Sequence, residues 1–176
     1  MSAVLRQAIS PDELDRARAL AASVTDPELP VLTLADLGVL RDVHAEDGTV
    51  VATITPTYSG CPAMAAMRDD LVRTLTTAGF DDVEVRVRLQ PAWSTDWISD
   101  EGRESLRRNG ISPPGSAPQH VAGAIPLQLG PTRRTLACPR CGSSATRLVS
   151  EFGATACKSL HRCESCLEPF EHVKEI

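Results

Sequence analysis

Six cysteines are the residues whose types and spacing could do chemistry in this chain. Four of them form two Cys-x-x-Cys pairs, Cys138 with Cys141 and Cys163 with Cys166, separated by residues 142–162. Each pair folds as a tight turn whose two thiolates converge on one ion, and four sulfurs together make a tetrahedral site. The pattern predicts a four-cysteine zinc ribbon. Four thiolates close the coordination shell, so the metal would stabilise the fold without an open position for catalysis.

The identity of the metal is inferred rather than read from the pattern. Four sulfurs also suit a single iron ion, as in rubredoxin. We predict one zinc per chain, with a one-iron redox site as the alternative. Cys157 is interpreted as a small buried side chain, as a replacement ligand or, beside Lys158, as an additional reactive thiol. His161 lies in the same segment and could supply a nitrogen ligand, but the four paired cysteines already complete the coordination of the ion.

Cys61 stands apart from the other cysteines, between Gly60 and Pro62. A helix is predicted over Met64–Ala78, so the thiol lies near a helix N-terminus, where unpaired N–H groups and the helix dipole stabilise a thiolate. A lone cysteine is more often an inert core residue. Neither a histidine nor a second cysteine lies near Cys61 in the sequence, which disfavours a hydrolase or a peroxidase. A thiolate that binds iron, or another protein's cluster, is the remaining functional interpretation.

Asp26 and Glu28 flank Pro27 in the loop after the first predicted helix. Composition alone favours an ordinary solvated turn at this place. Trp93 and Trp97 are either core residues or a surface that faces a partner, and we expect the core.

The surrounding elements predict an α+β domain. Ser10 and Glu13 have the spacing of a helix-starting capping box, and residues 26–30, with two prolines, must end that helix. Alternating apolar residues predict strands over residues 39–44, 50–54 and 83–89. The apolar stripe of the Met64–Ala78 helix consists of Met64, Met67, Leu71, Leu75 and Ala78. A charged helix is expected from about residue 99 to residue 109.

The chain is predicted to divide into an α+β domain over residues 1–110, a proline- and glycine-rich linker over 111–131, and the ribbon over 132–176. The last unit is too small for a core of its own without a metal. The net charge of −5 argues against a general nucleic-acid binder. Without an apolar stretch of membrane-spanning length or a signal peptide, we expect a cytoplasmic protein, where cysteines bind metals rather than form disulfides. The oligomeric state stays open, a homo-oligomer included.

Several segments together resemble known families. Residues 25–32, 36–39 and 55–63 resemble the small domain shared by bacterial and eukaryotic iron–sulfur assembly factors, with the likeness extending over roughly residues 10–112. Residues 91–99 and 153–170 make the resemblance specific to one family. They are similar to the D-subunit family (also called J) of the phenylacetyl-CoA epoxidase system, in which this domain precedes a zinc ribbon.

The resemblance implies a functional thiol at Cys61, supported by an acidic loop at Asp26 and Glu28. It also implies aerobic phenylacetate degradation, with a di-iron oxygenase and a reductase that carries flavin and a [2Fe–2S] centre. The chain has neither paired Glu-x-x-His motifs nor a glycine-rich dinucleotide fingerprint, so these residues alone do not perform the ring chemistry.

The expected role is therefore that of an accessory protein rather than of an enzyme by itself. It would mature or maintain the iron–sulfur reductase, with iron or an iron–sulfur cluster held transiently at Cys61. The alternative is a structural or electron-transfer subunit of the epoxidase complex. In both cases the partners are the reductase and the other subunits, with no membrane.

Overall fold

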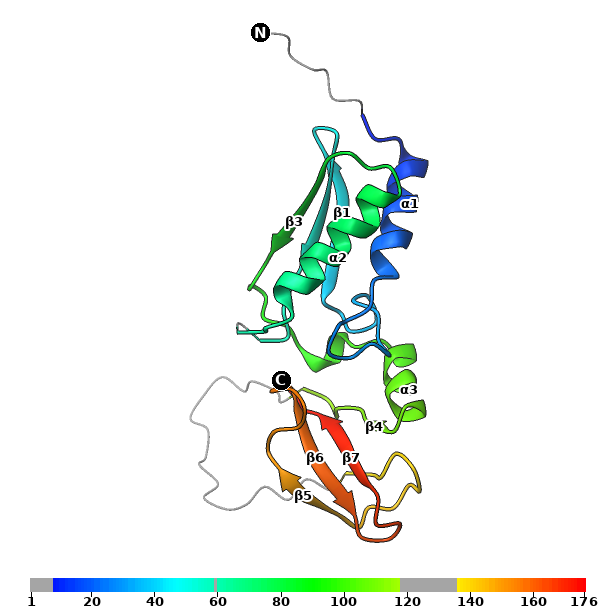
Figure 1. The fold of residues 1–176 in the computed structure, drawn as a ribbon, viewed down its shortest axis with the longest axis vertical. Coiled ribbons are helices and arrows are strands. Elements are labelled where there is room, and N and C mark those ends of the chain that lie inside the picture. Colours follow the sequence, from blue (N-terminus) through cyan, green and yellow to red (C-terminus); the bar gives the residue numbers. More distant parts are fainter. Residues whose placement is uncertain (1–7, 59, 118–135) are drawn as a thin grey trace. The chain divides into compact units, whose positions relative to one another are not determined.

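The structure is a computed structural model that describes residues 8–58, 60–117 and 136–176. It consists of two compact units (Figure 1). The N-terminal unit contains the chain up to residue 93 together with residues 97–102, and the C-terminal unit contains residues 94–96 and 103–176. Residues 118–131 of the predicted linker lie outside the described residues. Within the described part of the predicted linker, Ile111–Ser112 form a short strand, β4.

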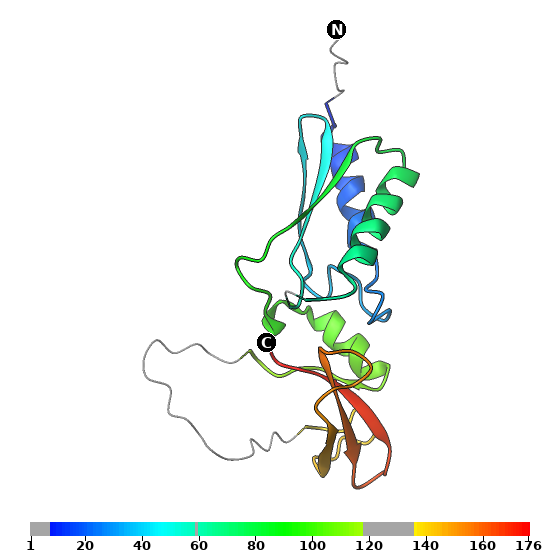
Figure 2. The ribbon, with the colours of Figure 1, turned by 60° about the vertical axis from the view of Figure 1, so that its left-hand side comes forward.

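The N-terminal unit is a three-stranded sheet with two helices on one face, as Figures 1 and 2 show. Its sheet has the order β1-β2-β3, with β1 antiparallel and β3 parallel to the central strand β2. The elements in chain order are α1 (Pro11–Ala22), β1 (Leu40–Glu46), β2 (Thr49–Ile54), α2 (Met64–Thr77) and β3 (Val83–Val87). The prediction of a mixed helix-and-sheet domain is confirmed.

Local sequence accounts for the helices. The backbone N–H of Glu13 donates to the Ser10 hydroxyl at 3.3 Å, and the Ser10 N–H donates to the Glu13 carboxylate at 2.8 Å, which is the predicted capping box. Three residues of the predicted α2 stripe, Met67, Leu71 and Leu75, are buried. The central strand differs from its predicted alternation, because every residue from Val50 to Ile54 is buried. Polar Thr53 is enclosed together with the apolar residues of this strand and is 3% exposed.

A 3-10 turn at Thr95–Trp97 and helix α3 (Asp100–Arg108) follow the first sheet. Trp93 is a core residue, 4% exposed, whose indole N–H donates to the carbonyl of Leu37 at 2.9 Å. Trp97 is half-buried and has the Arg41 guanidinium 3.7 Å above its ring. The expectation of core tryptophans therefore holds fully for Trp93 and partly for Trp97.

The C-terminal unit is a four-stranded sheet of order β4-β7-β6-β5. Its longer strands are β5 (Thr146–Ser150), β6 (Lys158–Cys163) and β7 (Pro169–Val173), which pair antiparallel, while β4 pairs parallel to β7. A small buried cluster in this unit consists of Cys138, Cys163 and Phe170, with Cys166 packed against it. So little apolar material calls for an additional stabilising element. Within the described residues, no helix combines the length and the apolar character needed to cross a bilayer.

Candidate metal centre and candidate functional thiol

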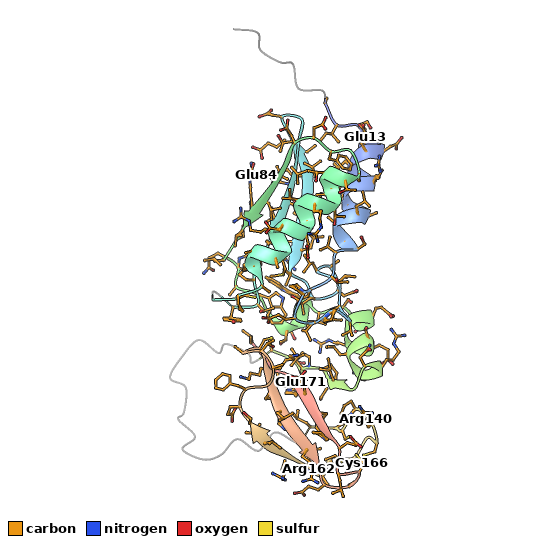
Figure 3. All side chains as sticks on the ribbon, viewed as in Figure 1. Glu13, Glu84, Arg140, Arg162, Cys166 and Glu171 are labelled. Carbon is orange, nitrogen blue, oxygen red and sulfur yellow. The ribbon has the colours of Figure 1, made fainter. Side chains whose placement is uncertain are left out.

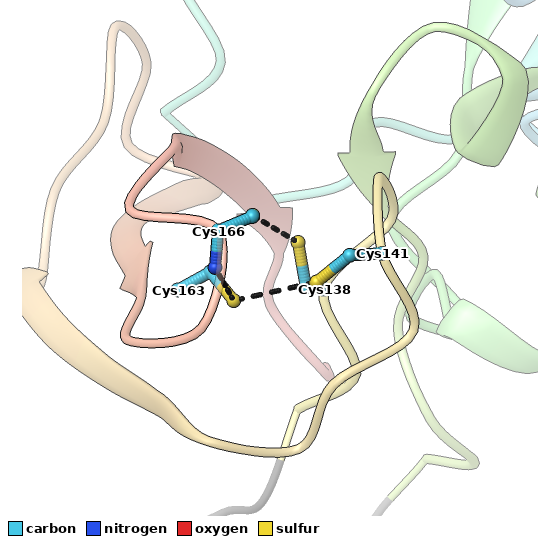
Figure 4. Close-up of side chains that lie close together, drawn as sticks. All are labelled: Cys138, Cys141, Cys163 and Cys166. Carbon is cyan, nitrogen blue, oxygen red and sulfur yellow. Dashed lines mark hydrogen bonds between the residues drawn. The ribbon is translucent and has the colours of Figure 1, made fainter.

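Four cysteines converge at the end of the C-terminal sheet (Figure 4). Their sulfur atoms all lie within 4.8 Å of one another. Cys138 Sγ is 3.7 Å from Cys166 Sγ, and Cys141 Sγ is 3.6 Å from Cys163 Sγ. Sulfurs at the corners of a tetrahedron with metal–sulfur bonds of about 2.3 Å lie about 3.8 Å apart. The spacing fits a four-thiolate metal site, and all six cysteines are thiols rather than disulfides.

The two Cys-x-x-Cys turns are built alike. The Cys138 N–H donates to the Ser143 carbonyl at 2.9 Å in the first turn, and the Cys163 N–H donates to the Glu168 carbonyl at 3.0 Å in the second. A hydrogen bond of 2.7 Å between the hydroxyls of Ser143 and Ser165 joins them. The two turns that carry the cysteines are therefore joined by a hydrogen bond that does not involve a metal.

The electrostatics of the cluster favour a cation. A backbone N–H bond from Cys166, at 3.5 Å from the sulfur, lowers the pKa of Cys163 to about 6. The N–H of Glu168 acts in the same direction on Cys166, but burial and the neighbouring cysteines outweigh it and raise the pKa of Cys166 to about 12. Thiolates this close repel one another, so a bound cation is needed to keep all four ionised.

Cys157 and His161 lie outside this cluster. The Cys157 sulfur is 3.1 Å from the Thr155 hydroxyl. His161 is buried, stacks on Phe170 and has Nε2 3.0 Å from the Ser159 hydroxyl, and burial lowers its pKa. Lys158 is 4% exposed and pairs with Glu171 at 2.8 Å, so its ammonium has an acidic partner of its own. Cys157 is therefore not among the four clustered cysteines, and its side chain is only partly buried.

Cys61 lies in the connection between β2 and α2. It is partly buried, its N–H donates to the Tyr58 carbonyl at 3.2 Å, and its carbonyl accepts from Met64 N–H at 3.3 Å. The N-cap of α2 is Ala63, whose side chain makes no capping hydrogen bond. Cys61 therefore lies just before the helix, in a turn that leads into it.

The Asp26 carboxylate has a structural task in its loop. Asp26 is 6% exposed, and its Oδ1 accepts from the N–H groups of Glu28 at 2.7 Å and Leu29 at 2.8 Å. Its own N–H donates to the Leu32 carbonyl at 3.0 Å. Glu28 is more exposed than Asp26. The loop is therefore not an ordinary solvated turn: Asp26 is an internal acceptor that fixes its shape.

Topology brings these two loops to one end of the N-terminal unit. Because β1 and β2 are antiparallel, the start of β1 and the end of β2 lie at the same end of the sheet. The Asp26 loop leads into β1 and the Cys61 loop follows β2, as Figures 1 and 2 show. A hydrogen bond of 2.9 Å from Thr55 N–H to the Val39 carbonyl joins the two connections directly.

Comparison with known proteins agrees with both units. Residues 15–87 match the family described as iron-sulfur cluster assembly protein, and residues 124–174 match the PaaD zinc beta ribbon domain. The chain is 46% identical over 168 residues to an Escherichia coli (strain K12) protein named as the D-subunit of 1,2-phenylacetyl-CoA epoxidase, with 96% of each chain covered. This chain belongs to the phenylacetyl-CoA epoxidase D-subunit family.

The N-terminal unit of this D-subunit family member also has relatives of its own. An Fe-S protein maturation auxiliary factor from Porphyromonas gingivalis (strain ATCC BAA-308 / W83) is 33% identical, covering 48% of this chain and 81% of that protein. One from Bacillus subtilis (strain 168) is 36% identical, covering 47% and 82%. The family resemblance seen in the sequence is confirmed.

The backbone conformation after each Cys-x-x-Cys pair of the D-subunit ribbon could not be predicted from the cysteine spacing. The residue after each second cysteine has a positive φ, 73° at Gly142 and 65° at Leu167. The first turn uses glycine there, but the second holds a leucine that is 61% exposed. A left-handed backbone at a branched residue is strained.

Proposed function

We propose that this protein is an accessory factor of aerobic phenylacetate degradation that matures or maintains the [2Fe–2S] reductase of the phenylacetyl-CoA epoxidase. The observation that carries the proposal is the position of Cys61. It lies within the part of the chain that matches iron–sulfur cluster assembly proteins, in a loop at one end of the sheet. The loop fixed by Asp26 is at the same end.

Cys61 is the residue that would handle the cargo. A thiolate sulfur is a ligand for iron, whereas hydroxyl groups such as those of Thr57 and Tyr58 are poor ligands for a cluster. A single protein thiolate leaves the remaining iron positions to other ligands. Cysteines of the client could therefore replace Cys61 in turn as the cluster is delivered. Asp26 would support this end of the sheet by fixing the shape of its own loop, and Glu28 is the more exposed acidic group beside it.

The four-cysteine cluster would hold one zinc ion through Cys138, Cys141, Cys163 and Cys166. Zinc has no redox chemistry at this site, and it would supply folding free energy to a unit with a small apolar cluster. The ribbon is then available for docking to the reductase or to other components of the epoxidase. We place these events in the cytoplasm.

The deciding experiment compares the reductase purified from strains with and without this protein. Iron, acid-labile sulfide and flavin per chain are measured in both preparations. We expect the reductase from the deletion strain to be poor in iron and sulfide but normal in flavin, and a plasmid with the wild-type gene to restore the cluster. Equal cluster occupancy in the two preparations would refute the maturation role.

The alternative is a structural or electron-transfer subunit with a redox-active iron in the ribbon. The sulfur spacing of 3.6 and 3.7 Å favours it as much as zinc, since iron also takes four thiolates in a tetrahedron. One iron held by four thiolates absorbs visible light and zinc does not. Colourless protein with one equivalent of zinc, absent from the purified epoxidase complex, would rule this alternative out.

A further inference from the structure

β5 is the outer strand of the C-terminal sheet. Among the described strands, it pairs with β6 and has no neighbour on its other side, as Figure 1 shows. The Glu164 N–H donates to the Ala145 carbonyl at 2.7 Å on the β6 side. In the alternating antiparallel pattern, the backbone groups of Arg147 then also face β6, and those of Leu148 face outward. The outer edge of β5 therefore offers backbone groups to a further strand.

Two arginines are neighbours at this edge. Arg147 on β5 is directly opposite Arg162 on β6. Directly opposed residues of an antiparallel pair project from the same face, with Cβ atoms about 4.5–5.5 Å apart. Both arginines are exposed, and Arg162 lies at the surface of the C-terminal unit in Figure 3. Like charges in this position destabilise a sheet, so an opposite charge beside them would be favourable.

Neither arginine forms an ion pair with a described residue. Arg162 Nε donates to the Leu167 carbonyl at 3.1 Å, which is a neutral acceptor. Within residues 8–58, 60–117 and 136–176, the Arg147 side chain has no hydrogen bond or ion pair. The strand Thr146–Ser150 itself contains no acidic residue. The edge therefore presents a positive charge that would attract a carboxylate.

Apolar side chains accompany these arginines. Leu148 and Val149 on β5 are 45% and 48% exposed, and Phe152 just after the strand is 65% exposed. An exposed edge strand with apolar side chains is a template for pairing with another chain, whereas a charge on it excludes partners of like charge. The combination therefore selects for a partner strand that carries both apolar and acidic residues.

We propose that β5 binds an extended acidic segment of another protein, which adds to the sheet as an antiparallel strand. In strand addition, main-chain hydrogen bonds supply affinity and alternate side chains supply specificity. The partner residue opposite Arg147 would occupy a non-hydrogen-bonded position, where facing side chains are closest. A glutamate there would pair with Arg147, and the apolar residues next to it would cover Leu148. The inference does not depend on the role of Cys61.

Charge argues against the two occupants that this chain itself could supply. A second copy of β5 would bring another arginine, and no carboxylate, to the edge. Residues 118–135 contain two arginines and neither aspartate nor glutamate, so that segment also lacks the group that the edge would attract. An acidic strand from a different protein is the occupant that fits the charge.

The test is NMR titration of the isotope-labelled, metal-loaded full chain with end-blocked heptapeptides. The acidic probe alternates valine and glutamate, and the basic probe has lysine in place of glutamate. We expect saturable shifts of the β5 amide signals with the acidic probe and none with the basic probe. The dissociation constant should rise about fivefold or more in Arg147→Glu, because an attractive contact becomes repulsive. Arg88→Glu is the matched control, since this exposed arginine of the N-terminal unit changes the net charge equally.

Two methylated versions of the acidic probe test strand addition on the wild-type chain. In an antiparallel added strand, the valine N–H groups would face β5 and the glutamate N–H groups would face away from it. N-methylation of the valines should therefore abolish binding, whereas N-methylation of the glutamates should leave it. This comparison does not depend on the folding of any variant.

The proposal fails if the acidic probe gives no saturable shifts at β5, or if the two methylated probes bind alike. It also fails if Arg147→Glu and Arg88→Glu weaken binding equally, since the attraction would then depend on net charge alone. Analytical ultracentrifugation of the free chain tests self-association. A dimer that Arg147→Glu converts into a monomer would show that a second copy occupies the edge, which would overturn the proposal.

Discussion

The sulfur atoms of Cys141 and Cys163 lie 3.6 Å apart although they belong to different Cys-x-x-Cys turns. The distance is too long for a disulfide, whose sulfurs lie about 2.05 Å apart, and close to the edge of a metal–sulfur tetrahedron. The spacing therefore suits two turns that would share one metal ion rather than be joined by a covalent bond.

The first prediction is that Cys141→Ser loses the metal and unfolds the C-terminal unit. Metal binding at such a site contributes on the order of 10 kcal/mol of folding free energy. Elemental analysis and circular dichroism of the purified variant check the two results. Cys157→Ser is the matched control and should keep one metal ion per chain, because Cys157 lies outside the cluster. Metal loss in the control, with retention in Cys141→Ser, would reassign the ligands.

The second prediction separates the two acidic residues of the first loop. Asp26→Ala leaves the N–H groups of Glu28 and Leu29 without their acceptor, and should lower the free energy of unfolding by about 2 kcal/mol. Glu28→Ala changes a more exposed side chain and should lie within about 0.5 kcal/mol of wild type. Urea denaturation followed by tryptophan fluorescence measures both. Equal effects would show that Asp26 does not fix the loop.

The third prediction concerns a close approach in the N-terminal unit. A Cβ on Gly38 would lie 2.6 Å from Trp97 Cβ and 2.7 Å from the Trp97 carbonyl oxygen. Gly79 also has a positive φ, but a Cβ there meets nothing within 4 Å. Gly79→Ala should therefore cost only the backbone strain, about 1 kcal/mol, and Gly38→Ala roughly 3 kcal/mol. Thermal unfolding of the two variants checks the difference, and equal shifts would contradict the packing explanation.

The fourth prediction concerns the ion pair between Lys158 and Glu171. The Lys158 side chain is 5% exposed, so Glu171→Gln leaves a buried ammonium unpaired and should cost about 3 kcal/mol. Glu168→Gln, at an exposed carboxylate, is the control with little expected effect. Chemical denaturation of the metal-loaded protein measures both, and a cost below that of the control variant would refute the importance of the pair.

The pH dependence of this cost follows from the pKa of Glu171. Burial raises it, but the hydrogen bond from Lys158 and the N–H of Ala154 outweigh burial and lower the pKa below its ordinary value of 4.5. A lowered pKa gives stability that is complete above the ordinary value and is lost only as the pH falls through the lower one. The cost of Glu171→Gln should therefore be constant between about pH 6 and 8. A cost that changes across this interval would contradict the lowered pKa.

The fifth prediction is that Cys61→Ser leaves the N-terminal unit folded but abolishes function. Serine fits the space of cysteine, but its hydroxyl neither ionises near neutral pH nor binds soft metals. Growth on phenylacetate and cluster content of the reductase are the measurements, with Cys157→Ser as the second thiol control. Normal growth of the Cys61→Ser strain would show that this thiol is not functional.

Features that depend on local spacing could be predicted from the amino-acid sequence alone. Two Cys-x-x-Cys pairs defined the candidate metal ligands, since each pair makes its turn within four residues. The stripe of Met67, Leu71 and Leu75 defined the buried face of α2, because a helix repeats every 3.6 residues. The candidate role of Cys61 came from the resemblance to known families, because a lone cysteine in a loop does not by itself indicate a function.

Contacts between residues far apart in the chain required the folded structure. The pairing of Ile111 with Glu171, which joins β4 to β7, has no local signal, because strand partners far apart in the chain are selected by global packing. The same holds for the approach of Arg140 to Gly110. The inward turn of the Asp26 carboxylate also needed the fold, because a loop sequence does not show which polar groups its backbone must satisfy once it is buried.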